Sequence, residues 1–313
     1  MLIHAADYPQ LMRWLAKAAL QRALGALPQG ERLNYVFQRH VLRSFPVPDG
    51  AVRQKFTRAI AHISAYEEFG PGVPLGDATF YEFGAGWDLA IPVAYALLGV
   101  GKQVLVDIRP SARLELVNHS IATLERLRPQ LEEEAGRSLG ELGGQVGSVA
   151  ELEPRFGIRY LAPCDARDTG LDAGSIDFAS STDTCEHIPG DDLAAIFAES
   201  RRLLRPGGVF SCRIDLQDHY SYFDPSLSRY HFLRFSDRAW AAVNSPLHFQ
   251  NRLRSPEYLQ LVRDAGFELV REKPSWPSDE GRAKLLNMPL AERFRGMPVD
   301  ELGVTILSFV ART

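Results

Sequence analysis

The pattern of hydrophobic and polar positions is most regular in residues 79–110. Thr79–Phe83 alternates and is rich in aromatic and β-branched residues, which predicts a β-strand. Gly84 and Gly86 then allow a tight backbone turn and a close approach to a ligand. Leu89–Leu98 has the length and the apolar face of a helix. This stretch therefore predicts a strand, a glycine turn and a helix in succession.

A second strand with an acid at its end follows that helix. Gln103–Val106 is apolar enough to be a buried strand, and Asp107 stands at its carboxyl end. In a doubly wound sheet, ligands bind outside the carboxyl ends of the strands, where an acid can accept both hydroxyls of a ribose. The glycine turn and Asp107 together predict a cofactor that contains adenosine.

Strand and helix patterns continue to alternate after Asp107. Further strands are predicted at Ile158–Ala162, Ser175–Ser180, Gly208–Ile214, Phe267–Glu272 and Val304–Val310, with helices at Ser111–Arg128 and Asp192–Leu204. Such alternation indicates an α/β fold with a parallel sheet and right-handed crossovers.

The first 72 residues have a different character. Helices are predicted at Asp7–Leu27, Glu31–Arg43 and Ala51–Phe69, and the breaker-rich Gly70–Pro74 follows them. We therefore expect a helical N-terminal cap or lid at 1–72 and a cofactor-binding domain at 73–313. Residues 1–66 hold nine Lys/Arg against three Asp/Glu, although the whole chain has a net charge of −4. The basic segment is expected to dock on an acidic body; attraction of an anionic substrate is the alternative.

Composition places the chain among ordinary globular proteins. It has 313 residues, of which 45% are hydrophobic and 24% are charged. Its three cysteines lack the spacing of metal ligands, and an odd number of thiols fits a reducing compartment. Without an apolar run of about 18 residues or a secretory leader pattern, a cytoplasmic protein with no stable membrane insertion is expected. The dispersed basic residues argue against a nucleic-acid partner, and a homodimer is compatible with the sequence.

The residues around the glycine turn decide between adenosine-containing cofactors. A dinucleotide site uses G-x-G-x-x-G, which brings the backbone close to a pyrophosphate. Here Glu82 precedes the turn, and Trp87 and Asp88 directly follow Gly86. Two carboxylates would repel a pyrophosphate but would suit a ligand with a sulfonium and an ammonium group. S-adenosylmethionine (SAM) is such a ligand.

The loop after the third predicted strand adds another acid. Asp165 and Ala166 lie beside the strand that is expected to bind ribose. The Asp165 carboxylate can accept the exocyclic amine of adenine, and the Ala166 amide can face a ring nitrogen. A simpler interpretation is that Asp165 caps a turn or a helix. Its place in strand order after Glu82 and Asp107 favours the cofactor role.

Five short motifs stand in order over about Thr79–Arg213. They are E-F-G-A-G, V-D-I, C-D-A, E-H-I-P and R-R-L-L-R-P-G-G. In this order and spacing the chain resembles a class I SAM-dependent methyltransferase. The resemblance implies a seven-stranded Rossmann-like sheet with helices on both faces, and SAM across the carboxyl ends of its first half. It also indicates cofactor contacts at Glu82, Gly84, Ala85, Gly86, Trp87, Asp107, Ile108, Asp165, Ala166 and Thr182.

The region after the fifth strand is rich in aromatic residues. Residues 214–256 are expected to form a substrate insert, because aromatic side chains with convergent polar groups make small-molecule pockets. An aromatic insert that completes the core is the alternative. Histidine titrates near neutrality, so His219 and His187 are the candidate bases, and Tyr222 is a third candidate catalytic residue. Substrate contacts are expected from Tyr220, Tyr230 and Arg252. No metal site is expected.

Three functions remain open at this point. The first is methyl transfer from SAM to an oxygen, less readily a nitrogen, of a small polar metabolite or sugar. A weaker resemblance to methyltransferase-like proteins encoded among bacterial polysaccharide and natural-product genes supports this role in small-molecule biosynthesis. The second is cyclisation of SAM itself with release of methylthioadenosine, as in azetidine-2-carboxylate synthases. The third is a SAM-binding protein without turnover, which the full set of cofactor acids argues against.

Overall fold

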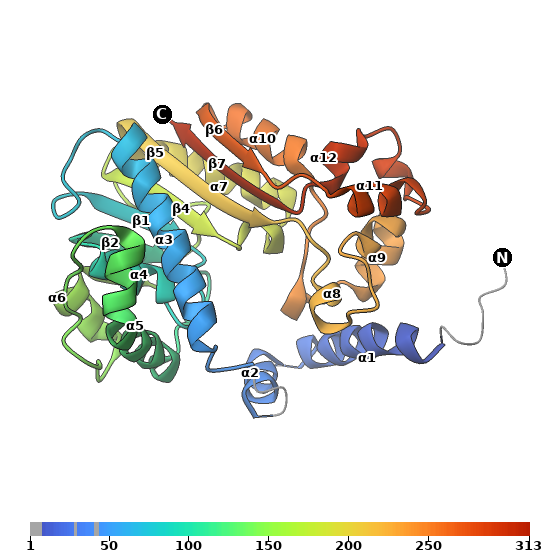
Figure 1. The fold of residues 1–313 in the computed structure, drawn as a ribbon, viewed down its shortest axis with the longest axis horizontal. Helices are drawn as coiled ribbons and strands as arrows, with labels where there is room; N and C mark the ends of the chain where they lie inside the picture. The colour runs from blue at the N-terminus through green and yellow to red at the C-terminus, as the bar shows by residue number, and fades with distance from the viewer. Residues whose placement is uncertain (1–7, 28–29, 41–43) are drawn as a thin grey trace.

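The protein is built around a seven-stranded mixed sheet (Figure 1). A computed structural model describes residues 8–27, 30–40 and 44–313. Within these residues the strand order is β3-β2-β1-β4-β5-β7-β6, and β7 runs antiparallel to both of its neighbours. The strands are β1 (Thr79–Phe83), β2 (Lys102–Val106), β3 (Ile158–Leu161), β4 (Ile176–Thr182), β5 (Leu204–Asp215), β6 (Glu268–Pro274) and β7 (Ile306–Arg312). Strand order reverses between β1 and β4, which is where open α/β sheets bind ligands.

Helices and short 3₁₀ turns fill the connections. The helices are α1 (Tyr8–Gly25), α2 (Gly30–His40), α3 (Asp49–Phe69), α4 (Ala90–Leu97), α5 (Leu114–Ala135), α6 (Leu152–Phe156), α7 (Gly190–Leu203), α8 (Tyr220–Phe223), α9 (Asp237–Val243), α10 (Ser255–Asp264), α11 (Asp279–Leu286) and α12 (Val299–Gly303). The 3₁₀ turns are η2 (Val149–Glu151), η3 (Cys185–His187), η4 (His231–Arg234), η5 (Pro246–His248) and η6 (Glu292–Phe294).

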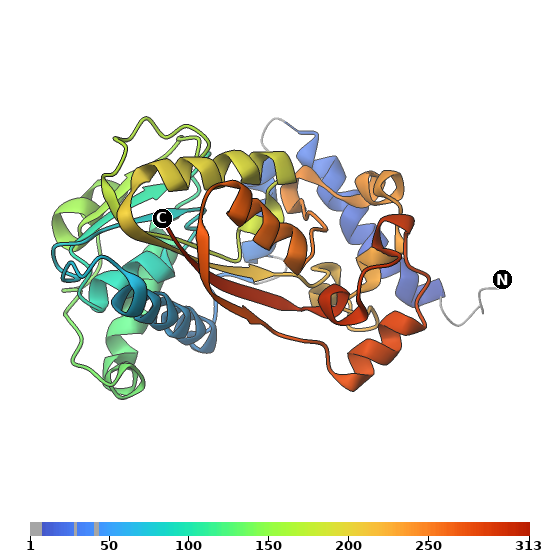
Figure 2. The same ribbon diagram turned by 90° about the horizontal axis from the view of Figure 1, so that it is seen from above.

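The sheet is covered on both faces (Figure 2). On one face, α3, α4 and α5 enclose a core that includes Phe80 of β1 and Phe178 of β4. On the other face, α7 and α10 pack over Tyr81 and Ala179. Successive residues of a strand point to opposite faces, so neighbouring side chains of β1 and of β4 enter different cores.

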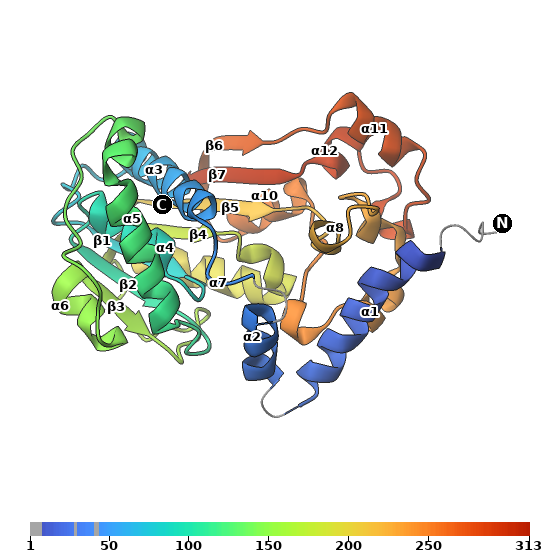
Figure 3. The same cartoon turned by 60° about the horizontal axis from the view of Figure 1, so that its bottom comes forward.

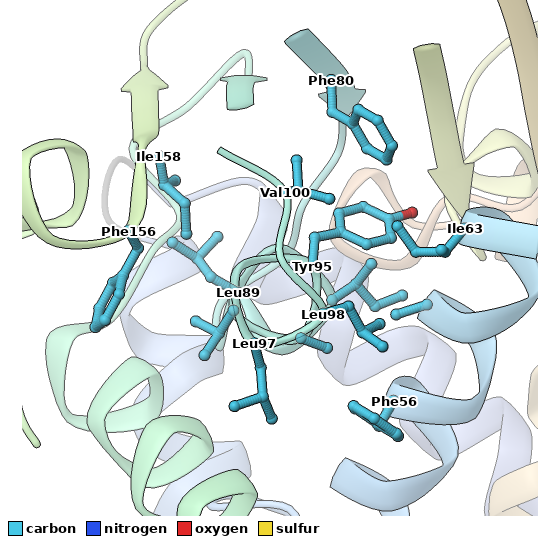
Figure 4. Packing of buried hydrophobic residues seen from close by; sticks show 14 of the residues in the cluster. Phe56, Ile63, Phe80, Leu89, Tyr95, Leu97, Leu98, Val100, Phe156 and Ile158 are labelled. Atoms are coloured by element: carbon cyan, nitrogen blue, oxygen red, sulfur yellow. The ribbon is translucent and has the colours of Figure 1, made fainter. Parts of the chain in front are cut away.

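Helix α4 lies at the centre of the first core. Tyr95 of α4 and Leu98, directly after the helix, meet Phe56 and Ile63 of α3 and Phe80 of the sheet (Figure 4). The Tyr95 hydroxyl also donates to Ser180 Oγ at 3.2 Å. Because α4 starts directly after the glycine turn, this packing fixes the turn against the end of β1.

The sequence predicted the fold class and the strands, and the structure confirms both. β1 has the predicted limits, and the remaining strands differ from prediction by a few residues at their ends. Strand β7 returns along β5 in the opposite direction, so the sheet is mixed and its parallel part ends at β5. Helix α5 runs past Pro129 to Ala135, because Leu131 is buried in the core and holds the last turns in place.

The three N-terminal helices divide into two groups. Val52 and Ile63 of α3 belong to the core on the sheet. In contrast, α1 and α2 contact η5, and Tyr35 of α2 packs against Trp87 of the glycine turn at 5.2 Å between ring centroids. Figure 3 shows α1 and α2 outside the sheet at this end. The predicted helix limits at Asp7 and Arg43 and the break at Pro28 lie outside the described residues.

The expected insert forms a third core together with α1. Trp14 of α1 packs on Tyr220 and on Phe235, with ring centroids 5.4 and 5.8 Å apart. Arg22 Nη1 donates to the carbonyls of Ala241 and Ala242 at 3.0 and 2.9 Å. These contacts bind α1 to residues more than 200 positions away in the chain.

Candidate functional site

The glycine turn between β1 and α4 is a tight site with a specific backbone requirement. Gly84 and Gly86 have φ values of +72° and +77°, which favour glycine. A Cβ on Gly84 would lie 2.2 Å from Thr184 Cγ2, whereas one on Gly86 would meet nothing within 4 Å. The Thr184 hydroxyl donates to the Gly84 carbonyl at 3.0 Å. Gly84 therefore serves close packing against the loop after β4, and Gly86 leaves open space beside the turn.

Glu82 is a buried acid at the carboxyl end of β1. Its side chain is 3% exposed, and its Oε2 atom has no hydrogen-bond partner among the described residues. Burial raises the pKa of Glu82 to about 8, and the charge of Lys55 opposes that rise. A cationic group with N–H donors would satisfy this oxygen and favour the carboxylate. The orphaned oxygen and the space beside Gly86 fit the ammonium-bearing methionine end of SAM.

Asp88 has a different role from the one expected. Its Oδ2 atom pairs with Lys55 Nζ at 2.5 Å, and its Oδ1 accepts from the Ala90 amide at the start of α4 at 3.2 Å. The carboxylate therefore holds α3 and α4 together. Its charge is therefore paired inside the protein, whereas the sequence analysis expected this carboxylate to face the cofactor cation.

Asp107 follows β2 at the same edge of the sheet. Burial raises the pKa of Asp107, and hydrogen bonds from nearby backbone amides and from Ser111 and Tyr160 oppose the rise. The Tyr160 hydroxyl lies 3.4 Å from Asp107 Oδ2 and also receives the Ser111 amide at 3.0 Å. The next residue, Ile108, is 62% exposed. A half-buried acid with an exposed apolar neighbour is suited to a ribose and the ring beyond it.

Asp165 lies at the edge as predicted but already has a partner. Arg167 holds both carboxylate oxygens, with Nη2 2.6 Å from Asp165 Oδ2, and its Nη1 reaches Asp192 at 2.6 Å. These hydrogen bonds keep the pKa of Asp165 below its usual value. An adenine amine would have to share the carboxylate with this guanidinium. Ala166, next in the loop, is half-buried.

Trp87 lies between the glycine turn and helix α2. It packs against Tyr35 and Phe45, with ring centroids 5.2 and 5.0 Å apart. It also borders a cavity of about 580 Å³ between α1, α2, η5 and the loop after Asp107. Arg32 and Arg113 line the same cavity. Among the ten predicted cofactor residues, Trp87 is the one that joins the turn to the N-terminal helices.

The end of β4 carries a polar network that the sequence analysis missed. His62 of α3 bridges Thr182 Oγ1 at 3.0 Å and Ser211 Oγ at 2.8 Å. Burial lowers the pKa of His62 to about 4, so the imidazole is neutral near neutral pH. Asp183 follows with a φ of +50° and forms ion pairs with Arg58 and Arg213. The histidine lies in a helix far from the motifs, so no local pattern in the sequence could indicate it.

Three of the residues proposed for catalysis or named in the motifs meet just beyond this network. Glu186, His187 and His219 each offer one ligand atom, and these atoms lie within 4.8 Å of one another. The ring centroids of His219 and Tyr222 are 5.5 Å apart. The Tyr222 hydroxyl donates to Asp215 and accepts from Gln217 Nε2 at 2.7 Å. The structure thus brings His187 and His219 together, with Tyr222 beside His219.

The local environment limits what these groups can do as bases. Burial and the neighbouring His187 and Lys17 lower the pKa of His219 to about 3. A base works best with a pKa near the working pH, so a free His219 imidazole is a weak proton acceptor. Burial also lowers the pKa of His187 and raises that of Tyr222. The imidazoles are therefore neutral, with lone pairs available.

The three predicted substrate contacts have structural roles instead. Tyr220 and Tyr230 are buried, and their hydroxyls donate to the carbonyls of Val243 and Gly303 at 2.9 and 3.1 Å. Arg252 is also buried; its guanidinium donates to the Phe232 carbonyl at 2.9 Å and pairs with Asp237 at 2.5 Å. Their polar ends are already satisfied inside the third core. The structure therefore supports the alternative that these aromatic residues complete the core.

The chain was compared with protein families, curated proteins and solved structures. A family model described as a methyltransferase domain matches residues 146–212, which include β3, β4, α7 and most of β5. No curated protein matches the chain.

Many solved structures are similar to this chain. One is a 1,6-didemethyltoxoflavin-N1-methyltransferase from Burkholderia thailandensis with bound S-adenosylhomocysteine: identity 17%, covering 100% of this chain and 92% of that one, TM-score 0.46. A SAM-dependent methyltransferase from Mesorhizobium loti is also similar, with 17% identity, coverage of 82% of this chain and 100% of that one, and a TM-score of 0.43. Another, from Clostridium acetobutylicum, has 10% identity, coverage of 90% of this chain and 97% of that one, and a TM-score of 0.43. The fold assignment rests on the sheet order rather than on these scores.

The sheet order shows a Rossmann-like methyltransferase fold, and residues 146–212 match a methyltransferase domain. Both agree with SAM as the cofactor that the sequence predicted. The described residues contain no helix that is long and apolar enough to cross a membrane.

Proposed function

We propose that the protein transfers the methyl group of SAM to a hydroxyl group, less readily a nitrogen, of a small polar metabolite or sugar. The observation that carries this proposal is the polar cluster of Glu186, His187, His219 and Tyr222. Its η3 turn begins directly after Thr184, which touches the glycine turn. An acceptor in this cluster would lie beside the cofactor residues, and carboxylate, imidazole and phenol groups suit a ligand with O–H or N–H donors.

The cofactor residues divide the work of holding SAM. We assign the ammonium of the methionine end to Glu82 and the backbone of the glycine turn, and the ribose hydroxyls to Asp107. Ile108, Asp165 and Ala166 would surround the adenine, with Arg167 keeping Asp165 in place. Support comes from burial, from the orphaned Glu82 oxygen and from the position of each residue at a strand end.

When bound, SAM would supply an electrophilic methyl group on its sulfonium, which an acceptor hydroxyl would take up with loss of its proton while the S–C electron pair stays on sulfur. The polar cluster's part is to hold the acceptor in line and to ease loss of that proton. Orientation alone accounts for much of the rate of such reactions. The neutral imidazoles and the Tyr222 phenol supply the fixed contacts.

Helices α1 and α2 form the cap over this edge in our proposal. The cavity beside Trp87 lies between these helices and the loop after Asp107. A cap here would exclude water from the reacting groups. Arg32 and Arg113 in the cavity wall would favour an acceptor that carries a negative charge.

The decisive experiment is product analysis with methyl-labelled SAM and a panel of hydroxylated metabolites and sugars. We expect S-adenosylhomocysteine to form only when an acceptor is present, with the label on an acceptor oxygen. Release of methylthioadenosine from SAM alone would instead establish cyclisation. Absence of SAM binding in calorimetry would rule out both methyl transfer and cyclisation. His219→Gln should lower turnover and leave SAM affinity unchanged, and His119→Gln, on α5, serves as the matched control.

A further inference from the structure

The cluster beyond β4 contains buried polar atoms that lie near one another without a hydrogen-bond partner. Glu186 is 1% exposed, and neither of its carboxylate oxygens has a hydrogen-bond partner among the described residues. The same holds for Nε2 of His219 and Nε2 of His248. Buried polar atoms of this kind normally have partners, so their convergence needs an explanation. A bound cation would satisfy Glu186 and His219 together with His187.

We propose that Glu186, His187 and His219 form a binding site for a divalent transition-metal ion. One ligand atom from each residue lies within 4.8 Å of the other two. Ligand atoms on one zinc ion, with bonds of about 2.0–2.2 Å, lie about 3.3 Å apart. Side-chain rotations of about 1 Å would therefore close the three ligands around a metal. Two imidazoles and one carboxylate leave at least one coordination position free, as in catalytic zinc sites.

The hydrogen bonds of His187 prepare it as a ligand. Its Nδ1 lies 2.7 Å from the Phe249 carbonyl, which can only accept, so Nδ1 carries the proton. The lone pair is therefore on Nε2, the nitrogen left for a metal. A ligating histidine usually donates its other ring N–H to a carbonyl or a carboxylate in this way.

Residues 249–251, called the 249–251 bracket below, form hydrogen bonds with the segments that carry all three ligands. Asn251 donates its amide to the Glu186 carbonyl at 2.7 Å, and its side chain donates to Cys185 and Ile188 on either side. The Gln250 side chain accepts the His219 amide at 3.1 Å. These contacts join two segments that are about 30 residues apart in sequence, and none of them occupies the ligand atoms.

The nearest alternative is a protonated Glu186 that shares its proton with one imidazole. That arrangement pairs Glu186 with one imidazole and leaves the other imidazole without a partner, whereas a metal ion would bind one atom of each of the three residues. The choice of metal follows from the ligands: nitrogen and oxygen donors in a His₂Glu set favour Zn²⁺ and its transition-metal neighbours over Mg²⁺ or Ca²⁺.

This step rests on the proposed function: the free coordination position of the metal would bind the acceptor hydroxyl. A divalent cation lowers the pKa of a bound oxygen and so releases its proton to solvent at neutral pH. This role would make Glu186, His187 and His219 metal ligands, with Tyr222 and Asp215 beside the acceptor.

The test is a metal titration of the full chain after treatment with a chelator, without SAM or any acceptor. We expect one equivalent of Zn²⁺ to bind in competition with a chromophoric chelator. Co²⁺ should give the visible absorption of a low-coordinate nitrogen and oxygen site. Glu186→Gln and His219→Gln should each abolish this binding, and His119→Gln should retain it. Asn251→Ser, a positioning change, should weaken it about 10- to 100-fold.

Specific outcomes would overturn the proposal. The proposal is wrong if the wild type and Glu186→Gln bind the same amount of metal. It is also wrong if His219→Gln gives the same Co²⁺ spectrum as the wild type. Circular dichroism and thermal melting check that each variant is folded, and the Glu186→Gln change keeps size and shape. Because the titration uses no SAM, its failure leaves methyl transfer intact. Conversely, metal binding without methyl transfer would refute the proposed function alone.

Discussion

Glu82 shows how strongly the surroundings of one residue control its charge. The carboxyl is buried at the end of β1, and its pKa is raised to about 8. In the unfolded chain the same group loses its proton near pH 4.5. The folded state therefore binds one more proton between these values, and stability must fall as pH rises through this window. Lys55 limits the fall but does not remove it.

Glu82→Gln should remove this pH dependence. A neutral amide does not titrate, so the variant should gain over the wild type by about 1.4 kcal/mol per pH unit between about pH 4.5 and about pH 8. Denaturant unfolding at about pH 5 and about pH 8 measures the difference. If both proteins lose stability in parallel between these pH values, the inference that Glu82 is buried in its protonated form is wrong. The same variant should bind SAM more weakly, because it lacks the anion.

Gly84 is required to be glycine partly because of its contact with Thr184, a residue that is distant in sequence. Gly84→Ala should destabilise the fold through its positive φ and through the 2.2 Å approach to Thr184 Cγ2. The left-handed conformation costs about 1–2 kcal/mol, and the contact adds to it. Thr184→Ala removes the contact but not the strain, so the double variant should be less destabilised than the two single changes predict. Additive free energies of unfolding would exclude this coupling.

At the scale of elements, the sequence predicted the part of the fold that local patterns encode. Alternating residues in β1 and a helical period in α4 are local properties, and both elements appear as expected. The direction of β7 depends on which strand it pairs with, which no local pattern carries. The roles of Tyr230 and Arg252 depend on hydrogen bonds to carbonyls that are distant in sequence. The aromatic composition of residues 214–256 therefore predicted a substrate pocket, whereas the structure has a packed core there.

Arg254 ties the insert to the sheet and should be indispensable for stability. The side chain is fully buried and donates to the carbonyls of Leu216, Leu302 and Val304. Burial lowers its pKa to about 10, so it remains charged at neutral pH. Arg254→Met should cost about 3–5 kcal/mol, because it leaves these buried carbonyls unpaired. Chemical denaturation measures the loss; a change below about 1 kcal/mol would refute this role.

Trp14 should decide whether α1 stays docked. It is buried against Tyr220, His231 and Phe235, so Trp14→Ala removes most of the apolar contact of α1 with the insert. We expect faster proteolysis within α1 while the sheet core stays protected, because local opening costs less than global unfolding. Leu15→Ala, at an exposed position on the same helix, is the control. Equal cleavage of the two variants would contradict the docking.

For the whole molecule, the uneven charge seen in the sequence becomes a set of contacts. Arg39, Arg53 and Arg58 pair with Glu115, Glu134 and Asp183 of the acidic body. The expected electrostatic docking is therefore present. Exposed pairs contribute little individually to stability, so their main effect is to position the N-terminal helices against the rest of the protein. The candidate site was predictable at that edge because strand ends and motifs coincide there, whereas His62 and the 249–251 bracket come from tertiary packing.

The cofactor site can be tested through the stability of the entire fold. A ligand that binds only the native state stabilises it by about 2.7 kcal/mol at 100 times its Kd. Asp107→Ala should leave the melting temperature without SAM nearly unchanged, because the acid lies at the edge of the sheet outside the cores. If the change weakens binding 100-fold, the stabilisation at the same SAM concentration falls to about 0.4 kcal/mol. Asp77→Ala, an exposed acid before β1, should keep the full thermal shift. An undiminished shift in Asp107→Ala would mean that the ribose is held elsewhere, and the assignment of the whole edge would then have to be rebuilt from Glu82 and the glycine turn alone.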